Sequence, residues 1–593
     1  MSRQSLVFFS AWFAIQLAAS YDPDGLIPPM VMTGGGTISR TGDAPAPPRD
    51  FYIDALAGDD AHEGSAGRPW RGIARANALD LNPGDRLLFR AGQSFTGNLT
   101  LSQEDAGTSN APVVLTSWGG GQAHIEAGEG TGVRVINAGG VTVENLRITG
   151  AGPDANAGSG VRFENTLLGA VKLEHVVISN VVCSGFGGQF GKERNEFGAV
   201  GQSGEGIFVG GTARDRSKSG FRHVRITDCV AHNNEYFGIY ISGAWDAKSP
   251  HYANEDVTIT RCDMYHNLGD PDYLDNHSGS GLLMEDVAGG LIEHCRAWEN
   301  GARCRSKAGG PCGIWAAVAT RVTIEHCESW RNRTGHSDGD GFDFDGGVTD
   351  SVMRYNLAWE NEGAGILLYT YAGSPHTWAR NLVHHNLCVN NATKGDYGGI
   401  SIGNHGGGWE GGVVCHNTII TARDHPSNSG LHIIAAGKSP GIVVANNLVV
   451  SRGVTTLLNA AMHPDLRVIG NAWWADDGQA RFRFEGKSCG SLEELRTVTG
   501  VEQLGNRARG FEGNPGLETL DLPPDWIAAA DSPKADPHRF SALKTGRLRA
   551  NASLAGKALP WSTIAPGYPV PSVDFYQQPV SRKPVPGAGS GED

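Results

Sequence analysis

Residues 322–332 read VTIEHCESWRN, and two neighbouring stretches repeat the pattern: GLIEHCRAWEN at 290–300 and SVMRYNLAWEN at 351–361. Each copy has a Cys or Asn at the same place and a tryptophan three residues later. This position recurs about thirty residues apart through the middle of the chain. Its members are Cys229, Cys262, Cys295, Cys327, Asn356, Asn386, Asn417, Asn447 and Asn471. A regular period of this length indicates a solenoid of stacked repeats.

Each repeat also contains a glycine followed by a short alternating segment, such as GIYI at 238, GFDF at 341 and GILL at 365. The repeats have neither the leucine scaffold of leucine-rich repeats nor the helices of ankyrins. We therefore predict an all-β fold, a single-stranded right-handed parallel β-helix with capped ends and about three short strands per coil. Successive coils would lie about 4.8 Å apart, the ordinary spacing between strands.

In such a coil the recurring Cys or Asn points inward and forms a ladder, in which Asn bonds to neighbouring coils and Cys packs. Most of the ten cysteines are then packing residues. Cys304 and Cys312, in the loop CRSKAGGPC, are the exception, and sequence leaves a disulfide and two free thiols equally open. Trp298, Trp330 and Trp359 should stack from coil to coil, which favours a structural role over a sugar-binding surface.

The two ends of the chain lack the repeat. The first twenty residues combine Arg3, an apolar run and small residues, the pattern of a secretory signal, so we expect a secreted or periplasmic protein. The stretch SLEELRTVTG at 491–500 predicts a short helix after a Ser cap. The predicted parts are a signal peptide (1–20), a linker (21–48), an N-terminal cap with the first coils (49–130), the β-helix repeats (131–475), and a C-terminal cap with a disordered tail (476–593).

The formal net charge of the 593-residue chain is −14. This excess of acid argues against nucleic acid as a partner, and it means that an anionic substrate would need a cation nearby. No later stretch of sequence is long and apolar enough to predict a membrane span. We expect a monomer with a polysaccharide as its partner.

Both ends of the repeat region resemble those of a known group. The stretch YIDALAGDDAHEGSAGRPWRGIARAN (52–77) with NPGDRLLFRAG (82–92), and VDFYQQP (573–579), resemble the entry and closing segments of the pectate-lyase-like superfamily of right-handed β-helix proteins. The resemblance implies a short helix near Ile73–Leu79 that covers the open end of the solenoid. It specifies the fold well and the activity weakly.

The stretch HSDGDGFDFDGG at 336–347 carries four aspartates within eight residues. Because side chains alternate along a strand, Phe342 and Phe344 should point into the solenoid, and Asp343 and Asp345 should point out, about 6.6 Å apart at their roots. In-register stacking would place aromatic and acidic side chains of neighbouring coils on the same outer face, where they could bind sugar rings and hydroxyls. The predicted substrate-binding residues are Trp315, Tyr369, Tyr371, Glu285 and Tyr240.

Asp338, Asp340, Asp343 and Asp345 could together hold Ca²⁺, which prefers several oxygen ligands. SDGDGFDFD also resembles the Asp-Asp-Gly-Trp-Asp segment of the ninth-family pectate lyases, whose aspartates hold calcium; Asp340 and Asp343 match ligand positions of that motif. Gly339 stands in place of the preceding ligand, and a further Asp from the previous coil has no counterpart. In this interpretation a base, with Lys394, Arg380 and His405 as candidates, removes the proton beside a uronate carboxylate.

Three other interpretations stay open. Asp343 and Asp345 could be the acid and base of a glycoside hydrolase, since their spacing lies near the lower edge of the inverting range. The cluster could be a structural turn, or the aromatic face could belong to a glycan-binding protein without activity. The sequence favours a polysaccharide-cleaving enzyme, and a calcium-assisted lyase over a hydrolase. Its candidate catalytic residues are Asp343, Asp345, Lys394 and His405.

Overall fold

The computed structural model describes residues 47–187, 203–423, 425, 427–435, 440–461, 465–530, 539–549, 552–580 and 584–589. The predicted signal peptide and nearly all of the predicted linker lie outside these residues. Among the described residues, none of the helices has the length and apolar character that crossing a membrane requires.

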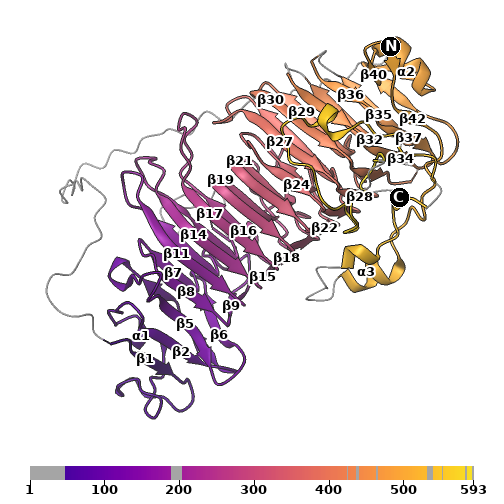
Figure 1. Cartoon of the computed structure of the whole chain (residues 1–593). Helices are drawn as coiled ribbons and strands as arrows, with labels where there is room; N and C mark the ends of the chain where they lie inside the picture. The colour runs from indigo at the N-terminus through magenta and orange to yellow at the C-terminus, as the bar shows by residue number, and fades with distance from the viewer. Residues whose placement is uncertain are drawn as a thin grey trace.

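The described chain winds into an elongated solenoid whose strands stack in three columns (Figure 1). Within each column every strand pairs in parallel with the strand about one repeat earlier or later, which confirms the predicted parallel stacking. Strands β19 and β21 each run without interruption through the first and second columns.

The first column carries the outer face on which the aspartates lie. It consists of β4 (Leu99–Leu101), β7 (Val133–Ile136), β10 (Val161–Asn165), β13 (Ile207–Gly211), β16 (Phe237–Ser242), β19 (Ser280–Glu293), β21 (Cys312–Glu325), β23 (Asp340–Phe344), β26 (Ile366–Tyr371), β29 (Gly398–His405), β32 (Ser429–Ala435), β35 (Thr456–Ala461) and β38 (Phe482–Phe484).

The second column follows the first along each coil. Besides the second halves of β19 and β21, it consists of β1 (Asp50–Ile53), β2 (Arg86–Arg90), β5 (Val113–Trp118), β8 (Val141–Glu144), β11 (Lys172–Ser179), β14 (Gly220–Thr227), β17 (Asn254–Thr260), β24 (Val352–Arg354), β27 (Trp378–His384), β30 (Trp409–Cys415), β33 (Ile442–Ala445) and β36 (Arg467–Ile469).

The third column completes each coil. It consists of β3 (Ser94–Thr96), β6 (Ala123–Gly128), β9 (Leu146–Gly150), β12 (Val182–Ser184), β15 (Val230–His232), β18 (Asp263–Tyr265), β20 (Arg296–Trp298), β22 (Glu328–Trp330), β25 (Leu357–Trp359), β28 (Leu387–Val389), β31 (Thr418–Ile420), β34 (Leu448–Ser451), β37 (Ala472–Ala475) and β42 (Phe511–Glu512).

The remaining elements lie near the ends of the described chain. They are α1 (Ile73–Ala76), η1 (Gln103–Asp105), β39 (Lys487–Cys489), α2 (Leu492–Thr499), β40 (Gln503–Leu504), β41 (Arg507–Ala508), α3 (Pro524–Ala530), η2 (Arg539–Ala542) and α4 (Trp561–Ile564). The predicted entry helix is present as α1, with Ile73 buried. The predicted C-terminal helix is α2, where the Ser491 hydroxyl accepts from the Glu494 amide.

The predicted inward ladder runs through the core. The Asn386 side chain donates to Asn417 Oδ1 at 2.9 Å, and Asn417 donates to Asn447 Oδ1 at 2.9 Å. At its C-terminal end the ladder meets the buried carboxyl group of Glu502, which accepts from the Asn471 side chain at 2.9 Å. Each rung therefore satisfies the next, and the column ties successive coils together.

The tryptophan stack has the structural role that the sequence favours. Trp298 and Trp330 stack at 4.8 Å between ring centroids, and Trp330 and Trp359 at 5.5 Å. The C-terminal part of the chain returns along the third column and covers this stack, as the yellow trace in Figure 1 shows. Trp330 and Trp359 are fully buried, so these rings do not form a surface for sugar.

The last described residues differ from the predicted disordered tail. Residues 584–589 pack against the coils: Val585 and Ala588 are buried, and the Ala588 amide donates to Thr418 Oγ1 at 2.8 Å. The sequence signal of small residues and proline is the same for a flexible tail and for a segment that fits closely into a groove. Cys304 and Cys312 are free buried thiols, which answers the open question of a disulfide.

Candidate functional site

The outer face of the first column brings together the residues that the repeat aligns. Asp343 lies in register with Trp315 on the preceding coil and with Leu367 on the following coil. Phe342 and Phe344 belong to the main hydrophobic core, so they point inward as predicted. Trp315 belongs to a separate hydrophobic cluster, which lies outside the coil wall.

Asp343 is buried on this outer face, with only 3% of its surface exposed. Burial and the neighbouring charges of Asp345 and Asp340 raise the pKa of its carboxyl group well above the usual range. Its Oδ1 finds no hydrogen-bond partner among the described residues. The sequence predicts the outward direction of this side chain but gives no sign of its burial.

Asp345 is partly exposed, and burial of its carboxyl group, together with the charges of Asp338 and Glu285, raises its pKa to about 7. Its Oδ1 has no hydrogen-bond partner within the described part of the chain. This carboxyl group therefore keeps its proton to higher pH than an ordinary aspartic acid does, which suits a proton donor.

Asp338 and Asp340 are engaged with the protein itself. Asp338 Oδ1 accepts from the Tyr397 hydroxyl at 2.8 Å, and Oδ2 accepts from the Gly310 amide at 2.5 Å. Asp340 is fully buried and its Oδ1 accepts from the Ala364 amide. Both carboxyl groups thus hold loops against the coils.

These contacts fit a calcium cage poorly. In the described ranges, no three His, Cys, Asp or Glu side chains are arranged to hold a metal ion. Asp338 and Asp340 already accept hydrogen bonds from the protein, whereas Ca²⁺ takes six to eight oxygens. Calcium binding stays a prediction from the sequence.

Aromatic side chains lie on the C-terminal side of the aspartates. The Tyr369 ring is 5.2 Å from the His405 ring and 6.4 Å from the Tyr371 ring. Carboxyl groups reach these rings electrostatically, since the charges of Asp345 and Asp343 help raise the pKa of both tyrosines, after the larger effect of burial. Tyr369, Tyr371 and His405 are partly exposed and form a platform beside Asp345.

Glu285 lies on the N-terminal side. Its Oε2 accepts from the Tyr240 hydroxyl and from the Ser242 hydroxyl, each at 2.7 Å. Glu285 is in register with Ala317 on the next coil. Asp345 follows on the coil after that, since its amide donates to Ala316 O. The two carboxyl groups therefore stand two coils apart with a small residue between them.

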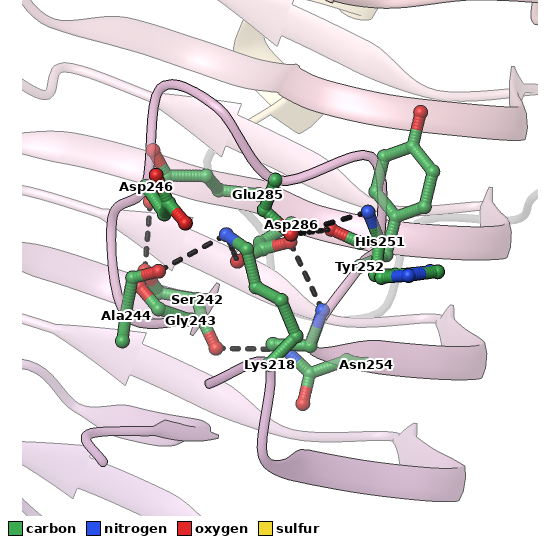
Figure 2. Close-up of polar contacts among 12 residues, drawn as sticks. Lys218, Ser242, Gly243, Ala244, Asp246, His251, Tyr252, Asn254, Glu285 and Asp286 are labelled. Atoms are coloured by element: carbon green, nitrogen blue, oxygen red, sulfur yellow. Dashed lines mark hydrogen bonds and ion pairs between the residues drawn. The ribbon is translucent and has the colours of Figure 1, made fainter. Parts of the chain in front are cut away.

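A buried ion pair fixes the wall beside Glu285. Figure 2 shows the Lys218 ammonium between Asp286 and the backbone of the loop after β16. Lys218 Nζ lies 2.7 Å from Asp286 Oδ2 and 3.0 Å from Ala244 O, and Asp286 Oδ1 accepts from the Ala253 amide at 3.0 Å. The pair thus ties both ends of this loop, residues 243–253, to β19.

The predicted bases Lys394 and Arg380 are held by other groups. Lys394 donates to the Thr334 carbonyl and lies 3.4 Å from Glu362 Oε2. Arg380 forms a two-pronged pair with the exposed Asp350 on the second column. The structure does not bring either of them into contact with the aspartates, whereas His405 lies on the aromatic platform.

Several residues at this face carry no repeat signal. Trp245 and Tyr273 come from loops on opposite sides of the first column and pack against the cluster around Trp315. The His277 ring lies 5.0 Å from the Trp315 ring, and burial lowers the pKa of this histidine to about 4. Loop residues have no column-mates, so the alignment of repeats could not have identified them.

Comparison with known proteins places the fold. A family model described as a right-handed β-helix region matches residues 121–410. The solved GH136 lacto-N-biosidase from Eubacterium ramulus, as its selenomethionine derivative, matches with a TM-score of 0.50 and 18% identity, over 66% of this chain and 67% of that chain. Pectate lyase Pel9A matches with a TM-score of 0.36 and 14% identity, over 92% of this chain and 96% of that chain.

One curated relative matches a short stretch. Lacto-N-biosidase from Bifidobacterium longum subsp. longum is 33% identical over 72 residues, which is 12% of this chain. The match spans only 4% of the length of that protein. The comparisons therefore show the fold, the right-handed parallel β-helix that the sequence predicts.

Proposed function

We propose that this protein is a glycoside hydrolase that cleaves an uncharged glycan on the outer face of the first column, with Asp345 as the general acid. The observation that carries the proposal is the state of this carboxyl group: its pKa is raised to about 7 and one oxygen lacks a partner in the described structure. A carboxylic acid that holds its proton near neutral pH can protonate a glycosidic oxygen. The neighbouring Tyr369 and Tyr371 would bind the sugar ring.

Asp338 is the favoured ionised partner. Burial raises its pKa, but its bonds from the Tyr397 hydroxyl and the Gly310 amide act in the opposite direction and stabilise the charged form. Asp343 has no such donor on Oδ1 and stays neutral more readily. In cleavage, the bond from C1 to the leaving oxygen breaks and that oxygen takes the proton of Asp345. Asp338 takes a proton from the water whose oxygen bonds to C1.

Charge argues for an uncharged substrate. This face carries several acidic side chains, namely Asp338, Asp343, Asp345 and Glu285. Lys218 and Lys394 are paired with Asp286 and Glu362. An anionic sugar would meet repulsion here unless a cation were added. The names of the two lacto-N-biosidases make a lacto-N-bioside the first substrate to test.

Calcium-assisted β-elimination of a uronate-containing glycan is the second candidate. The observation in its favour is His405, whose pKa burial lowers, so that the imidazole is neutral and able to accept a proton near Tyr369. Calcium would then be needed to neutralise the uronate carboxylate. Export of the protein by residues 1–20 would bring either activity to extracellular or periplasmic glycans.

The test is product analysis with the full chain. Lacto-N-tetraose, cellohexaose, xylohexaose and polygalacturonate are each incubated with and without a calcium chelator, and reducing ends and the ultraviolet absorbance of unsaturated uronate are measured. We expect new reducing ends from an uncharged substrate, no unsaturated product and no effect of the chelator. Unsaturated product that depends on calcium would establish the lyase instead. A protein that releases neither product would contradict both activities.

Variants assign the roles. Asp345→Asn should lower kcat by roughly 10²–10⁴-fold, the usual contribution of a general acid. In the wild type, kcat/KM should fall as pH rises above about 7, because Asp345 then loses the proton that it must donate. Asp338→Asn should lower kcat comparably and Asp343→Asn less. If Asp343→Asn lowered kcat as much as Asp345→Asn and Asp338→Asn did not lower it, the catalytic pair would be Asp343 and Asp345.

A further inference from the structure

Two glycines lie beside the tyrosines of the aromatic platform, at positions where the backbone alone does not require glycine. Gly403 lies inside β29, and Gly346 directly follows Asp345. Neither has a positive φ, in contrast to Gly347, whose φ of 78° favours glycine. Glycine inside a strand weakens it and often marks a place where another group approaches closely. The reason for these two glycines therefore lies in what surrounds them.

The Tyr369 ring occupies the place that a side chain at position 403 would take. Gly403 is in register with Tyr369 and belongs to the following coil. A Cβ atom on Gly403 would lie 2.7 Å from Tyr369 Cδ2 and 3.1 Å from Cε2. Ordinary contacts between carbon atoms are about 3.5–4.0 Å. The ring therefore leans toward the following coil, which also carries His405, whose ring is 5.2 Å away.

The Tyr371 ring leans in the opposite direction, over the end of the preceding coil. A Cβ atom on Gly346 would lie 2.6 Å from Tyr371 Cε1 and 3.0 Å from both Tyr371 Cζ and Ser374 Oγ. The Gly346 amide donates to the carboxyl group of Asp345, so Tyr371 lies directly beside that acid. The two tyrosines thus extend the platform over three coils, from Asp345 to His405.

A similar arrangement in the core has a different consequence. A Cβ atom on Gly412 would lie 2.7 Å from Trp378 Cζ3, and Trp378 is fully buried, so that ring has nowhere to move. Tyr369 and Tyr371 are partly exposed and could rotate into solvent at little cost in stability. The glycines beside them are therefore not explained by core packing. They leave room for the two rings against the coil wall.

We propose that Gly403 and Gly346 are positioning residues of the glycan site: because neither has a side chain, Tyr369 and Tyr371 lie where they can bind a sugar ring. The inference rests on the proposed function and deepens it, since it assigns the residues that set the directions of both rings. Dispersion contacts between a sugar and an aromatic ring weaken strongly when the ring moves by about 1 Å. A methyl group at either glycine would impose a displacement of that size.

Binding to an inactive variant tests the ring positions without the reaction. In the full chain carrying Asp345→Asn, the affinities of lacto-N-tetraose, cellohexaose and xylohexaose are measured by calorimetry, and we expect at least one of them to bind. Adding Gly403→Ala should weaken that binding about tenfold, and adding Tyr369→Ala should weaken it by a similar factor. Gly67→Ala is the matched control, because a Cβ atom there meets no atom within 4 Å. It should change the affinity less than about twofold.

A double variant separates positioning from a general loss of structure. If Gly403→Ala acts by displacing Tyr369, it should change the affinity less than about twofold once Tyr369→Ala has removed the ring, whereas independent effects would multiply to about a hundredfold. For a glycan that the wild type cleaves, Gly403→Ala should raise KM about tenfold and keep kcat within about threefold. Gly346→Ala should change both constants, because Gly346 also bonds to the Asp345 carboxyl group.

The outcomes distinguish this role from the proposed activity. Undiminished binding in a folded Gly403→Ala variant, losses that multiply in the double variant, or binding of none of the three glycans would overturn the positioning role. Melting temperatures establish whether each variant is folded, and Gly346→Ala with Tyr371→Ala makes the same comparison if Gly403→Ala fails to fold. The expected pattern of binding in a protein that cleaves nothing would retain the positioning role and reject the hydrolase.

Discussion

The inner ladder and the outer face are built by the same stacking of coils, but their polar groups differ in how far they are hydrogen-bonded. Inside the coils, Asn386 and Asn417 satisfy each other and their neighbours with bonds of 2.9–3.1 Å. On the outer face of the first column, Asp343 and Asp345 lie beside other acidic side chains. Each has one oxygen without a hydrogen-bond partner among the described residues. Register alone therefore gives proximity. A structural column is one in which the stacked groups form hydrogen bonds with one another. In a candidate site the stacked groups are left with unsatisfied atoms.

The largest expected effect breaks the inner ladder. Asn417→Leu removes the acceptor for the amide and side chain of Asn386 and the donor to Val383 O and Asn447 Oδ1. The buried groups left unsatisfied should lower the free energy of unfolding by about 5 kcal/mol, measured by denaturant titration. Asn514→Leu, at an exposed position near the C-terminal cap, should cost less than about 1 kcal/mol. Equal costs would mean that the ladder bonds contribute little.

This ladder is the part that sequence predicts best. The repeat can be recognised from one position, because an inward position admits few types of side chain. The same alignment of repeats also identifies the outer neighbours of Asp343, including Trp315. The burial of Asp343 was not predictable in this way. The loops that carry Trp245 and Tyr273 pack against the neighbouring Trp315 cluster, and such loops differ from coil to coil.

Pairing across the chain limits sequence analysis as well. Lys394 and Arg380 are plausible bases when only the sequence is considered, but each forms an ion pair with an acidic residue of another coil. Lys218 and Asp286 drew no attention in the sequence, since the contact joins two positions 68 residues apart. The role of a charged side chain depends on the group with which it pairs. Outside the regular strands, that group can be identified only from the three-dimensional structure.

The next effect concerns this buried pair. Lys218→Met should destabilise the protein by about 3 kcal/mol, since it leaves Asp286 buried without its countercharge. It should also expose residues 243–253 to proteolysis. Adding Asp286→Leu should restore much of the stability, because the unpaired charge is then gone. If the double variant were less stable than Lys218→Met, the ion pair would not be the reason for the loss.

A change on the outer face should have the opposite sign. The folded-state pKa of Asp345, about 7, lies above the ordinary value of 3.8, so the folded state holds this proton more tightly and loses stability as pH rises through that interval. Asp345→Asn avoids the buried charge and should raise the free energy of unfolding by about 2 kcal/mol at pH 8.5 and by little at pH 4. Asp350→Asn, at an exposed pair, should show no such pH dependence. Melting curves at both pH values check this.

The smallest effect extends the ladder by one rung. Cys327 occupies the position before the first Asn: its Sγ accepts from the Cys295 amide at 3.4 Å and donates to Ile292 O at 3.6 Å. In the next coil Asn356 makes the stronger version of the same contact, with 2.9 Å from Nδ2 to Ile324 O. Ile292 and Ile324 are in register, so an Asn at 327 would find its acceptor in the equivalent place.

Cys327→Asn should therefore raise the free energy of unfolding by about 0.5–1 kcal/mol, measured by denaturant titration. Its side chain can donate to Ile292 O and to Asn356 Oδ1, which already accepts from the Cys327 amide at 3.0 Å. Cys262→Asn is the matched control, because its neighbours in the ladder are Cys229 and Cys295 and the amide would find no Asn oxygen there. That variant should be destabilising. A gain at both positions would show that side-chain size rather than complementarity governs the ladder, and would remove the distinction between a satisfied inner column and an open outer one.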